Sequence, residues 1–529
     1  MPRQLPVTAR ADQKIPELGL RVSGPDAAFL YIERKEIPLH MAVVSVFDGP
    51  ICFDDFVANI ESKLDLIPRY RQIVVLPPYN LGEPTWMDDP HFDIRKHIFH
   101  VRLEPPGGEA ELEDLAGRIL SQVMDRSKPL WDIYVVDGLA DGRGALIPRV
   151  HHSLADGVTG VALLNVLFDT TADGSLALHK PSARAPKAPP AEPSLTEALG
   201  AAVYSTLDSL IAAEEGLVEF ARALFSEQTS DDLKGLLGVL PELAVSVERL
   251  PFNKPCGAER KFCWAEFDFA AVQAIRKAAG GTVNDVILAV LTRALARYVK
   301  LHKQSVVNRF VRIACPVSLR RGEQYGDMGN QISFMPVALP LDVTDPIEML
   351  KAVAARTETM KRARASELVS VASNCISAAP PALQALFWKT ISQVTLPVPL
   401  LNMVCTNVPG SPVALYAGGR RMLASYPQVP TGYELGVGCA VQSYDGKLFF
   451  GLIADAHVAR DVRRLRDFLY VSFRELCRSA GVTKARRPAK PRAKTSAAAK
   501  PATVAATAPA EQAPAEAPST IVTDEKAVA

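Results

Sequence analysis

The chain has 529 residues, of which 48% are hydrophobic and 22% are charged, and its formal net charge is +1. This length exceeds what one hydrophobic core supports, so we expect two domains with additional segments. The balanced charge excludes the overall positive field of a nucleic-acid-binding protein, and we expect no nucleic acid among the partners.

The eight cysteines are dispersed and form no CxxC pair, so we expect reduced thiols in a cytosolic protein. The first five residues, MPRQL, do not begin the apolar core of a signal peptide. The chain also contains no uninterrupted run of about 18 apolar residues. We therefore expect a cytoplasmic protein with no signal peptide and no transmembrane helix.

Apolar periodicity predicts alternating helices and strands in the N-terminal half, after a loose N-terminus over residues 1–20. The expected elements are a helix from Ala27, a strand over 41–47, helices over 53–66 and 109–124, and strands over 133–139 and 145–150. The turn at 141–144 predicts that the last two strands pair in antiparallel fashion. Pro148 lacks a backbone N–H group, which predicts an edge position or a bulge for its strand.

Two adjacent histidines, His151 and His152, follow this strand and precede Asp156 and Gly157. Histidine readily exchanges a proton near neutral pH, so the pair predicts a catalytic base. Two other interpretations are ordinary core histidines and metal ligands together with Asp156. Adjacent strand residues point to opposite faces, and no further His/Cys cluster completes a metal shell, so we expect no metal. Asp156 is placed to cap a short helix over 158–168, and Gly157 permits close backbone approach.

The remaining chain divides by composition. Residues 171–250 combine a Pro-rich linker with a helical connector, and 483–529 form an Ala/Pro/Lys tail that we expect to be disordered. A second set of elements is expected between them: strands over 262–269, 310–316, 332–339, 400–406, 436–444 and 447–454, and helices over 269–279, 286–299, 347–360 and 462–478. Asn284 and Asp285 precede the second of these helices, where a simple helix cap is their most common use.

The segment from His151 to Gly157, HHSLADG, is similar to the HHxxxDG motif of the CoA-dependent acyltransferase superfamily. That superfamily includes chloramphenicol acetyltransferases, carnitine acyltransferases and condensation domains. Further segments resemble the bacterial wax ester synthase/diacylglycerol acyltransferase family. They are SGPDAAFL at 23–30, PLW at 129–131, VNDV at 283–286, GNQIS at 329–333, TNVPG at 406–410, SYDG at 443–446 and Asp455.

This resemblance implies an α/β (α+β) fold of two chloramphenicol-acetyltransferase-like domains with mixed β-sheets and an active-site tunnel between them. We expect the N-terminal domain, with HHxxxDG, over 21–170 and the C-terminal domain over 251–482. Acyl-CoA would be a co-substrate, with no permanently bound cofactor. The acceptor would be the hydroxyl group of diacylglycerol or of a fatty alcohol.

The resemblance also implies residue roles. His152 would be the general base, and the acceptor oxygen would attack the thioester directly, without an acyl-enzyme. His151, Asp156 and Gly157 would support the motif, while Asn284, with Asp285 beside it, would stabilise the oxyanion. With these roles the chain would be a diacylglycerol or long-chain-alcohol O-acyltransferase.

Two alternatives remain open from the sequence. One is a superfamily acyltransferase with another alcohol acceptor. The other is a non-catalytic protein that binds lipid droplets or membranes. Whether it is an acyltransferase or a lipid-binding protein, we expect the chain to associate peripherally with the inner membrane or with lipid inclusions.

Overall fold

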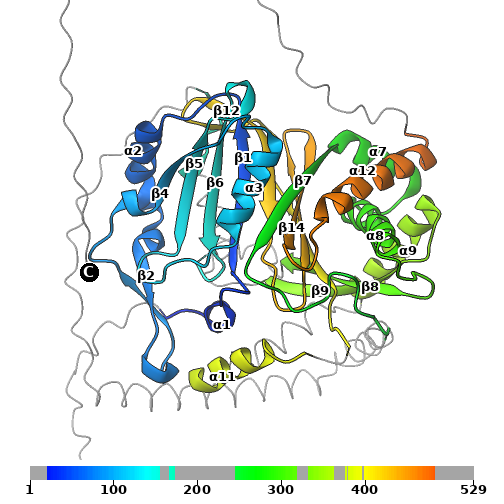
Figure 1. Ribbon diagram of the computed structural model, residues 1–529, viewed down its shortest axis with the longest axis horizontal. Helices are drawn as coiled ribbons and strands as arrows, with labels where there is room; N and C mark the ends of the chain where they lie inside the picture. The colour runs from blue at the N-terminus through cyan, green and yellow to red at the C-terminus, as the bar shows by residue number, and fades with distance from the viewer. Residues whose placement is uncertain are drawn as a thin grey trace, which may run out of the picture. The chain divides into compact units, whose positions relative to one another are not determined.

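The computed structural model describes residues 21–154, 166–172, 245–318, 332–362, 376–377, 379–395 and 398–482. All of them belong to one compact unit, Met1–Ala485. Two six-stranded sheets organise this unit (Figure 1). Both sheets mix parallel and antiparallel pairs, which confirms the expected α/β class with mixed sheets. Asp156, Gly157, most of the expected connector and the tail lie outside the described residues.

The first sheet contains the strand that leads to the two histidines. Its strands are, in spatial order, β11 (Tyr416–Ala417), β12 (Arg420–Gln428), β1 (His40–Phe47), β6 (Gly144–His151), β5 (Trp131–Asp137) and β4 (Ile98–Arg102). Only β4 and β5 pair in parallel; the other neighbours in this sheet are antiparallel. The expected hairpin of β5 and β6 is confirmed.

Several smaller elements surround this sheet. They are the helices α1 (Gly24–Ile32), α2 (Phe53–Lys63) and α3 (Glu109–Leu120), the hairpin of β2 (Gln72–Val75) and β3 (Thr85–Asp88), and the 3-10 helices η1 (Leu64–Leu66), η2 (Pro68–Arg71), η3 (Pro78–Asn80), η4 (Ile94–Lys96) and η5 (Ala140–Gly142). Helix α1 begins with a Ser23 cap whose hydroxyl accepts the Asp26 N–H. The capping agrees with the preference of serine for this position.

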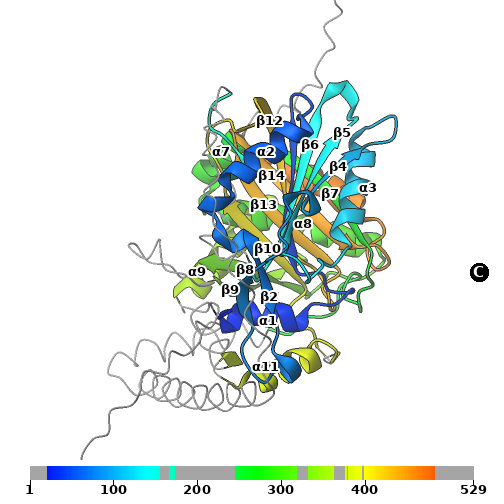
Figure 2. The same cartoon turned by 90° about the vertical axis from the view of Figure 1, so that its left-hand side faces the viewer.

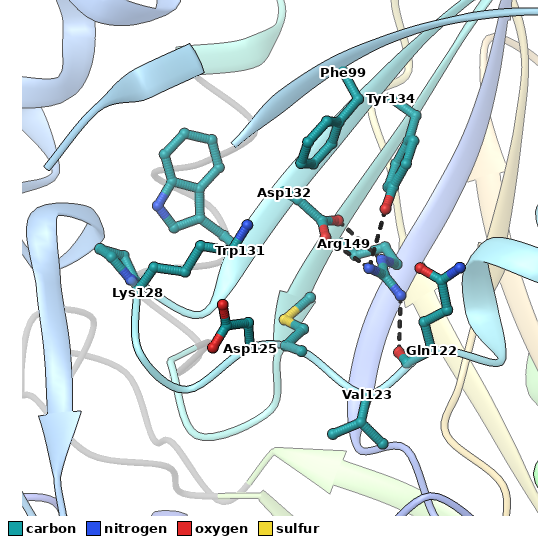
Figure 3. Close-up of a pocket in the computed structure, with 11 residues that line it drawn as sticks. Phe99, Gln122, Val123, Asp125, Lys128, Trp131, Asp132, Tyr134 and Arg149 are labelled. Carbon is teal, nitrogen blue, oxygen red and sulfur yellow. Dashed lines mark hydrogen bonds and ion pairs between the residues drawn. The ribbon is translucent and has the colours of Figure 1, made fainter. Parts of the chain in front are cut away.

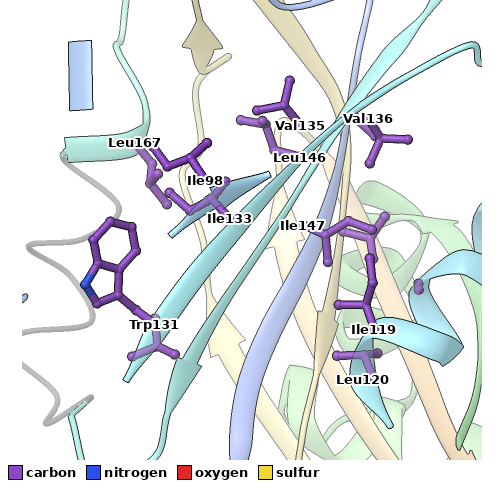
Figure 4. Close-up of a cluster of buried hydrophobic side chains, with 14 of the residues drawn as sticks. Ile98, Ile119, Leu120, Trp131, Ile133, Val135, Val136, Leu146, Ile147 and Leu167 are labelled. Atoms are coloured by element: carbon purple, nitrogen blue, oxygen red, sulfur yellow. The ribbon is translucent and has the colours of Figure 1, made fainter. Parts of the chain in front are cut away.

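Strand β6 is buried along its whole length. Figure 4 shows apolar side chains of β4, β5, β6 and α3 gathered on both faces of the first sheet, including Ile133, Leu146 and Ile147. A strand covered on both faces requires a continuous apolar run rather than an alternating one. This explains why the sequence before the histidines is almost uninterrupted in its apolar character.

The prediction that Pro148 needs an edge strand or a bulge is wrong. Strand β6 lies between β1 and β5, and Pro148 pairs in regular register with Ile133 of β5. On the β1 side, pairing runs from His40–His151 to Ala42–Arg149 and resumes at Ser45–Leu146. The missing N–H of Pro148 therefore coincides with a local gap in one ladder, which a central strand tolerates here.

The second sheet and its helices come from the C-terminal half. The strands are, in spatial order, β7 (Arg260–Asp268), β14 (Lys447–Asp455), β13 (Val437–Tyr444), β10 (Met403–Pro409), β8 (Phe310–Ser318) and β9 (Ile332–Pro340). The helices are α7 (Phe269–Ala279), α8 (Val283–Leu301), α9 (Pro346–Arg362), α11 (Pro381–Ile391) and α12 (Val462–Ser479). Residues of α7, α8, α9 and α12 share one apolar core with the inner strands of this sheet.

Strand β12 crosses from the C-terminal half into the first sheet, where it pairs with β1 over Ala42–Gln428 to Phe47–Met422. It also packs against β13 and β14 of the second sheet. This exchange was not predicted, because the expected C-terminal segment 251–482 was treated as a separate domain. The ladder with β1 joins this C-terminal strand to the first sheet, and its packing on β13 and β14 links it to the second. The expected domain boundaries stay predictions.

Helix α11 packs against α1 and lies beside it in both views (Figures 1 and 2). Arg34, just after α1, donates to the Ser392 carbonyl at 2.7 Å. No single helix in the described ranges is both long and apolar enough for a membrane span, and one pair, α7 with α8, reaches that composition only across a 98° bend.

Candidate active site

The end of strand β6 fixes the backbone of the two histidines. The His151 N–H donates to the Leu130 carbonyl at 2.9 Å, and the His152 N–H donates to the Leu39 carbonyl at 2.8 Å. Leu130 belongs to the PLW segment, so that segment anchors His151 through its backbone and also packs in the core. The Trp131 indole N–H donates to the Tyr70 carbonyl at 2.7 Å, which holds the ring in the core.

His151 is fully buried, and both of its ring nitrogens face polar groups. The Nδ1 atom lies 2.7 Å from Ser153 Oγ and accepts the Ser153 backbone N–H at 3.1 Å. The Nε2 atom lies 3.3 Å from Glu33 Oε1. Because the Ser153 N–H can only donate, Nδ1 is the acceptor, and this assigns the ring proton to Nε2, toward Glu33.

Glu33 directly follows α1, and its side chain is 0% exposed. Its carboxylate accepts the Leu39 N–H at 3.1 Å and an Arg126 N–H at 3.1 Å. Burial alone raises the pKa of Glu33, but the hydrogen bond and charge of His151, the Leu39 N–H and the Arg126 guanidinium outweigh it and lower the pKa overall. The side chain is therefore a carboxylate at neutral pH.

His152 is half-buried under the ring of Phe29, with ring centroids 3.9 Å apart and planes at 17°. Its Nδ1 is buried and has no hydrogen-bond partner within the described ranges. Burial, with a smaller contribution from charge on the adjacent His151, lowers the pKa of His152 from 6.5 to about 4. At neutral pH the imidazole is uncharged, so one of its nitrogens carries a free lone pair that can accept a proton.

Helix α1 contacts both histidines through one face. Phe29 and Glu33 are four residues apart, and side chains at this spacing lie on the same side of a helix. Phe29 stacks on His152, while Glu33 lies against His151. Neither role was predicted from the sequence, since the four-residue spacing places the two side chains on one side but does not show what that side contacts.

A buried ion pair joins β6 to β5 two residues before His151. Arg149 donates to both carboxylate oxygens of Asp132, at 2.9 and 2.6 Å, across the β5–β6 register pair that the two residues form. It also donates to the Gln122 carbonyl and the Tyr134 hydroxyl. Every arm of the guanidinium is thus occupied by protein groups, as Figure 3 shows.

This ion pair borders a cavity of about 180 Å³, shown in Figure 3. Its wall also includes Phe99, Lys128 and Trp131, and Lys128 points toward the Phe99 ring at 5.3 Å. Neither histidine lines this cavity. The hollow is therefore separate from the two candidate catalytic rings.

The structure separates the roles of Asn284 and Asp285 at the start of α8. Asp285 is buried and accepts from the Thr282 N–H at 2.7 Å and from the Thr357 hydroxyl at 2.7 Å. It caps α8 and ties it to α9. Asn284 is half-buried, and its side chain makes no hydrogen bond with another described residue. No described hydrogen bond, ion pair or ring contact joins Asn284 to either histidine, so their joint action stays a prediction.

Comparisons with known proteins bear on this arrangement. The model of the wax ester synthase/diacylglycerol acyltransferase catalytic domain matches residues 22–287, and the model of the C-terminal domain of the same family matches residues 328–477. Two probable diacylglycerol O-acyltransferases of Mycobacterium tuberculosis are 28% and 27% identical, cover 83% and 86% of this chain, and are themselves covered over 92% and 98% of their lengths.

Solved structures share the fold. The wax ester synthase/diacylglycerol acyltransferase from Marinobacter aquaeolei superposes with a TM-score of 0.58 at 23% identity, over 87% of this chain and 100% of the other. The first condensation domain of the calcium-dependent antibiotic synthetase superposes with a TM-score of 0.54 at 13% identity, over 88% and 97% of the two chains. The expected relationship to condensation domains thus extends to the architecture.

Proposed function

The chain belongs to the wax ester synthase/diacylglycerol acyltransferase family and is an acyltransferase, and we propose that it moves a long-chain acyl group from acyl-CoA to the hydroxyl of diacylglycerol, of a fatty alcohol, or of both. The names of the mycobacterial relatives support diacylglycerol as an acceptor. The family description supports fatty alcohols as well.

His152 is the general base in this proposal. A ring nitrogen takes the proton of the acceptor hydroxyl while the oxygen attacks the thioester carbonyl carbon. The tetrahedral oxyanion collapses, the carbon–sulfur bond breaks, and the CoA thiolate takes the proton back from the imidazolium. No acyl-enzyme forms, because the acceptor oxygen itself attacks the thioester.

The observation that carries this assignment is the contrast between the two rings. His151 is fully buried: its Nδ1 accepts from Ser153, and its Nε2 faces the Glu33 carboxylate at 3.3 Å. His152 is uncharged at neutral pH and is held by stacking on Phe29 rather than by polar partners. His151 is fully buried whereas His152 is only half-buried, so the second ring is the one that we expect a substrate to reach.

Asn284 is the proposed oxyanion donor. It lies in the first turn of α8, where backbone N–H groups and the positive end of the helix dipole favour a developing negative charge. Its amide is not used by the capping interactions, which Asp285 and Thr282 make between them. Asp156 and Gly157 keep their proposed supporting roles in the motif.

A lipid surface is the proposed partner that presents the acceptor. Large apolar side chains are exposed along α11 and the segment after it, where a protein surface normally carries few. They are Leu383, Leu386, Phe387, Ile391, Val394, Val398 and Leu400. Helix α11 packs on α1, the helix that contacts both histidines, so this apolar face borders the elements of the proposed site.

The base assignment is tested by His152→Ala. With palmitoyl-CoA and either diacylglycerol or hexadecanol, we expect CoA release to fall by about 10²–10⁴-fold, the range for loss of a general base. His100→Ala is the matched control, since His100 also stacks on a phenylalanine, Phe53, but is half exposed on β4. Undiminished turnover in His152→Ala, with His100→Ala also active, would refute the assignment.

The acceptor is tested by a screen with one acyl-CoA. Diacylglycerol and alcohols of several chain lengths are compared by kcat/KM, with the wild-type chain and His152→Ala in parallel. Turnover that depends on His152 with diacylglycerol, with a long-chain alcohol or with both supports the proposal. Dependence on His152 with none of these acceptors contradicts it.

The lipid-surface partner is tested by flotation with anionic phospholipid vesicles. Leu386→Asp combined with Phe387→Asp should reduce the vesicle-bound fraction severalfold, because two charges must then enter the interface. Leu66→Asp is the matched control, as Leu66 is equally exposed but lies in η1. Unchanged flotation of the α11 variant argues against this face as the contact.

A further inference from the structure

We propose that Glu33 is a positioning residue of the acyl transfer, which orients His152 through His151 and through the backbone of Leu39. The proposal rests on the assignment of His152 as the general base. Two independent paths of contacts lead from the Glu33 carboxylate to the histidine pair. Neither path was visible in the sequence, where Glu33 stands in the charged run ERKE.

The first path runs through the His151 ring. Glu33 Oε1 lies 3.3 Å from Nε2, while Ser153 occupies Nδ1 with its hydroxyl and its N–H. The Ser153 N–H sets the tautomer by donating to Nδ1, and the carboxylate faces the opposite edge of the ring at ion-pair distance. Because His151 and His152 share a peptide bond, a fixed His151 restricts how the His152 backbone can turn.

The second path runs through one residue of the chain, Leu39. The Leu39 N–H donates to Glu33 Oε1 at 3.1 Å, and the Leu39 carbonyl accepts the His152 N–H at 2.8 Å. The carboxylate therefore anchors the peptide segment that receives the backbone of the proposed base. Displacement of Glu33 would loosen the His152 backbone as well as the His151 ring.

Glu33 carries a full negative charge in a buried place. Arg126 donates to Oε2 at 3.1 Å and also to the Leu30 carbonyl at 2.8 Å, so the cation is itself fixed to the end of α1. Glu33 is buried and Arg126 is partly exposed, and an ion pair with a buried partner gives little net stability by itself, since desolvation offsets the attraction. In this proposal, the carboxylate orders the two histidines, which an apolar side chain of similar size would not do.

Glu33→Gln tests this role, because it keeps the shape of the side chain and removes its charge. We expect kcat to fall by about 10- to 100-fold, as a small misplacement of a catalytic group does. The KM for palmitoyl-CoA should change by less than about twofold, because Glu33 acts on the base and not on the bound donor. Glu36→Gln is the matched control: Glu36 is one-third exposed and pairs with Arg34 and Lys35, so its kcat should be unchanged.

A double-mutant comparison separates positioning from general support of the fold. If Glu33 acts through His152, adding Glu33→Gln to His152→Ala should lower the residual rate by less than about twofold. In the wild-type chain the same substitution should lower kcat by about 10- to 100-fold. An equal loss in both backgrounds, or wild-type kcat in Glu33→Gln, overturns the proposal. Full activity of His152→Ala alone would instead refute the general-base assignment, so the two failures are distinguishable.

A second variant covers the case in which Glu33→Gln does not fold. Ser153→Ala removes the hydroxyl from the opposite edge of the His151 ring and leaves the backbone N–H in place. We expect the same pattern from it, with a smaller loss of kcat, of about tenfold or less, and an unchanged KM. A Ser153→Ala enzyme with wild-type kcat would contradict the idea that a fixed His151 is needed.

Discussion

The ring of Phe29 lies nearly parallel to the imidazole of His152, at 3.9 Å between centroids. This contact joins the first helix of the chain to the end of β6, more than one hundred positions later in the sequence. It shields one face of the imidazole from water, and shielding from water disfavours the charged form of a histidine. The pH dependence of the enzyme follows from this relationship.

The acid limb of the pH profile should lie well below the ordinary histidine range. Burial lowers the pKa of His152 to about 4, so the neutral form that acts as a base persists as the pH falls through 6.5. Activity is lost only when the pH approaches the lowered pKa and the ring gains a proton. We expect kcat/KM for palmitoyl-CoA to stay nearly constant from pH 8 to about pH 5.5. An acid limb centred near pH 6.5 would contradict the burial of this ring.

Phe29→Ala should move that acid limb to higher pH. Loss of the stacked ring admits water to His152, and better hydration of the imidazolium raises the pKa back toward 6.5. Activity at pH 5.5 should therefore fall more than activity at pH 8. Phe53→Ala is the control, since Phe53 stacks on the exposed His100 at 5.3 Å. A profile of the same shape in Phe29→Ala and wild type would show that Phe29 does not shield the base.

The helices and hairpins that depend only on neighbouring residues were predictable from the sequence. Helix α7 has the expected bounds, Phe269–Ala279, because Asp268 caps it and glycines end it. The hairpin of β13 and β14 was predictable as well, because Asp445 and Gly446 both adopt the positive φ that its tight turn requires. Local turn and cap chemistry is sufficient in such places.

Elements defined by distant partners were not predictable in the same way. Strand β12 was not among the expected strands, and its place in the first sheet depends on pairing with β1, nearly 400 positions earlier in the chain. Glu33 was missed for a similar reason, since a glutamate within a charged run normally faces solvent. Its burial follows from how α1 meets β6, which no local pattern encodes. The histidine motif was found because its residues are adjacent in the sequence.

The buried pair of Arg149 and Asp132 should be important for stability rather than for chemistry. Asp132 holds Arg149 through two hydrogen bonds, and the paired carboxylate raises the pKa of Arg149 despite its burial. Arg149→Leu leaves a buried carboxylate without its cation, which costs about 3–5 kcal/mol of unfolding free energy. Thermal unfolding should show a clear loss, and Asp132→Leu added to Arg149→Leu should recover part of it.

An exposed pair provides the control for this prediction. Arg102 lies 3.9 Å from Asp137 with most of its side chain in solvent. Arg102→Leu should therefore change the unfolding free energy by less than about 1 kcal/mol. Similar stability losses in Arg102→Leu and Arg149→Leu would contradict the distinction between the two pairs.

Substitutions at the neighbouring residues Asn284 and Asp285 should affect different properties, kcat for Asn284 and the free energy of unfolding for Asp285. Asp285→Ala leaves the Thr282 N–H and the Thr357 hydroxyl without their acceptor, so we expect a loss of about 1–3 kcal/mol of unfolding free energy. Asn284→Ala removes no described hydrogen bond and should unfold like the wild type, while kcat falls by about 10²–10³-fold if its amide stabilises the oxyanion. Denaturant unfolding and palmitoyl-CoA turnover, measured on both variants, separate the two roles. Wild-type kcat in Asn284→Ala would exclude the oxyanion role, and unchanged unfolding of Asp285→Ala would show that its capping contacts contribute little.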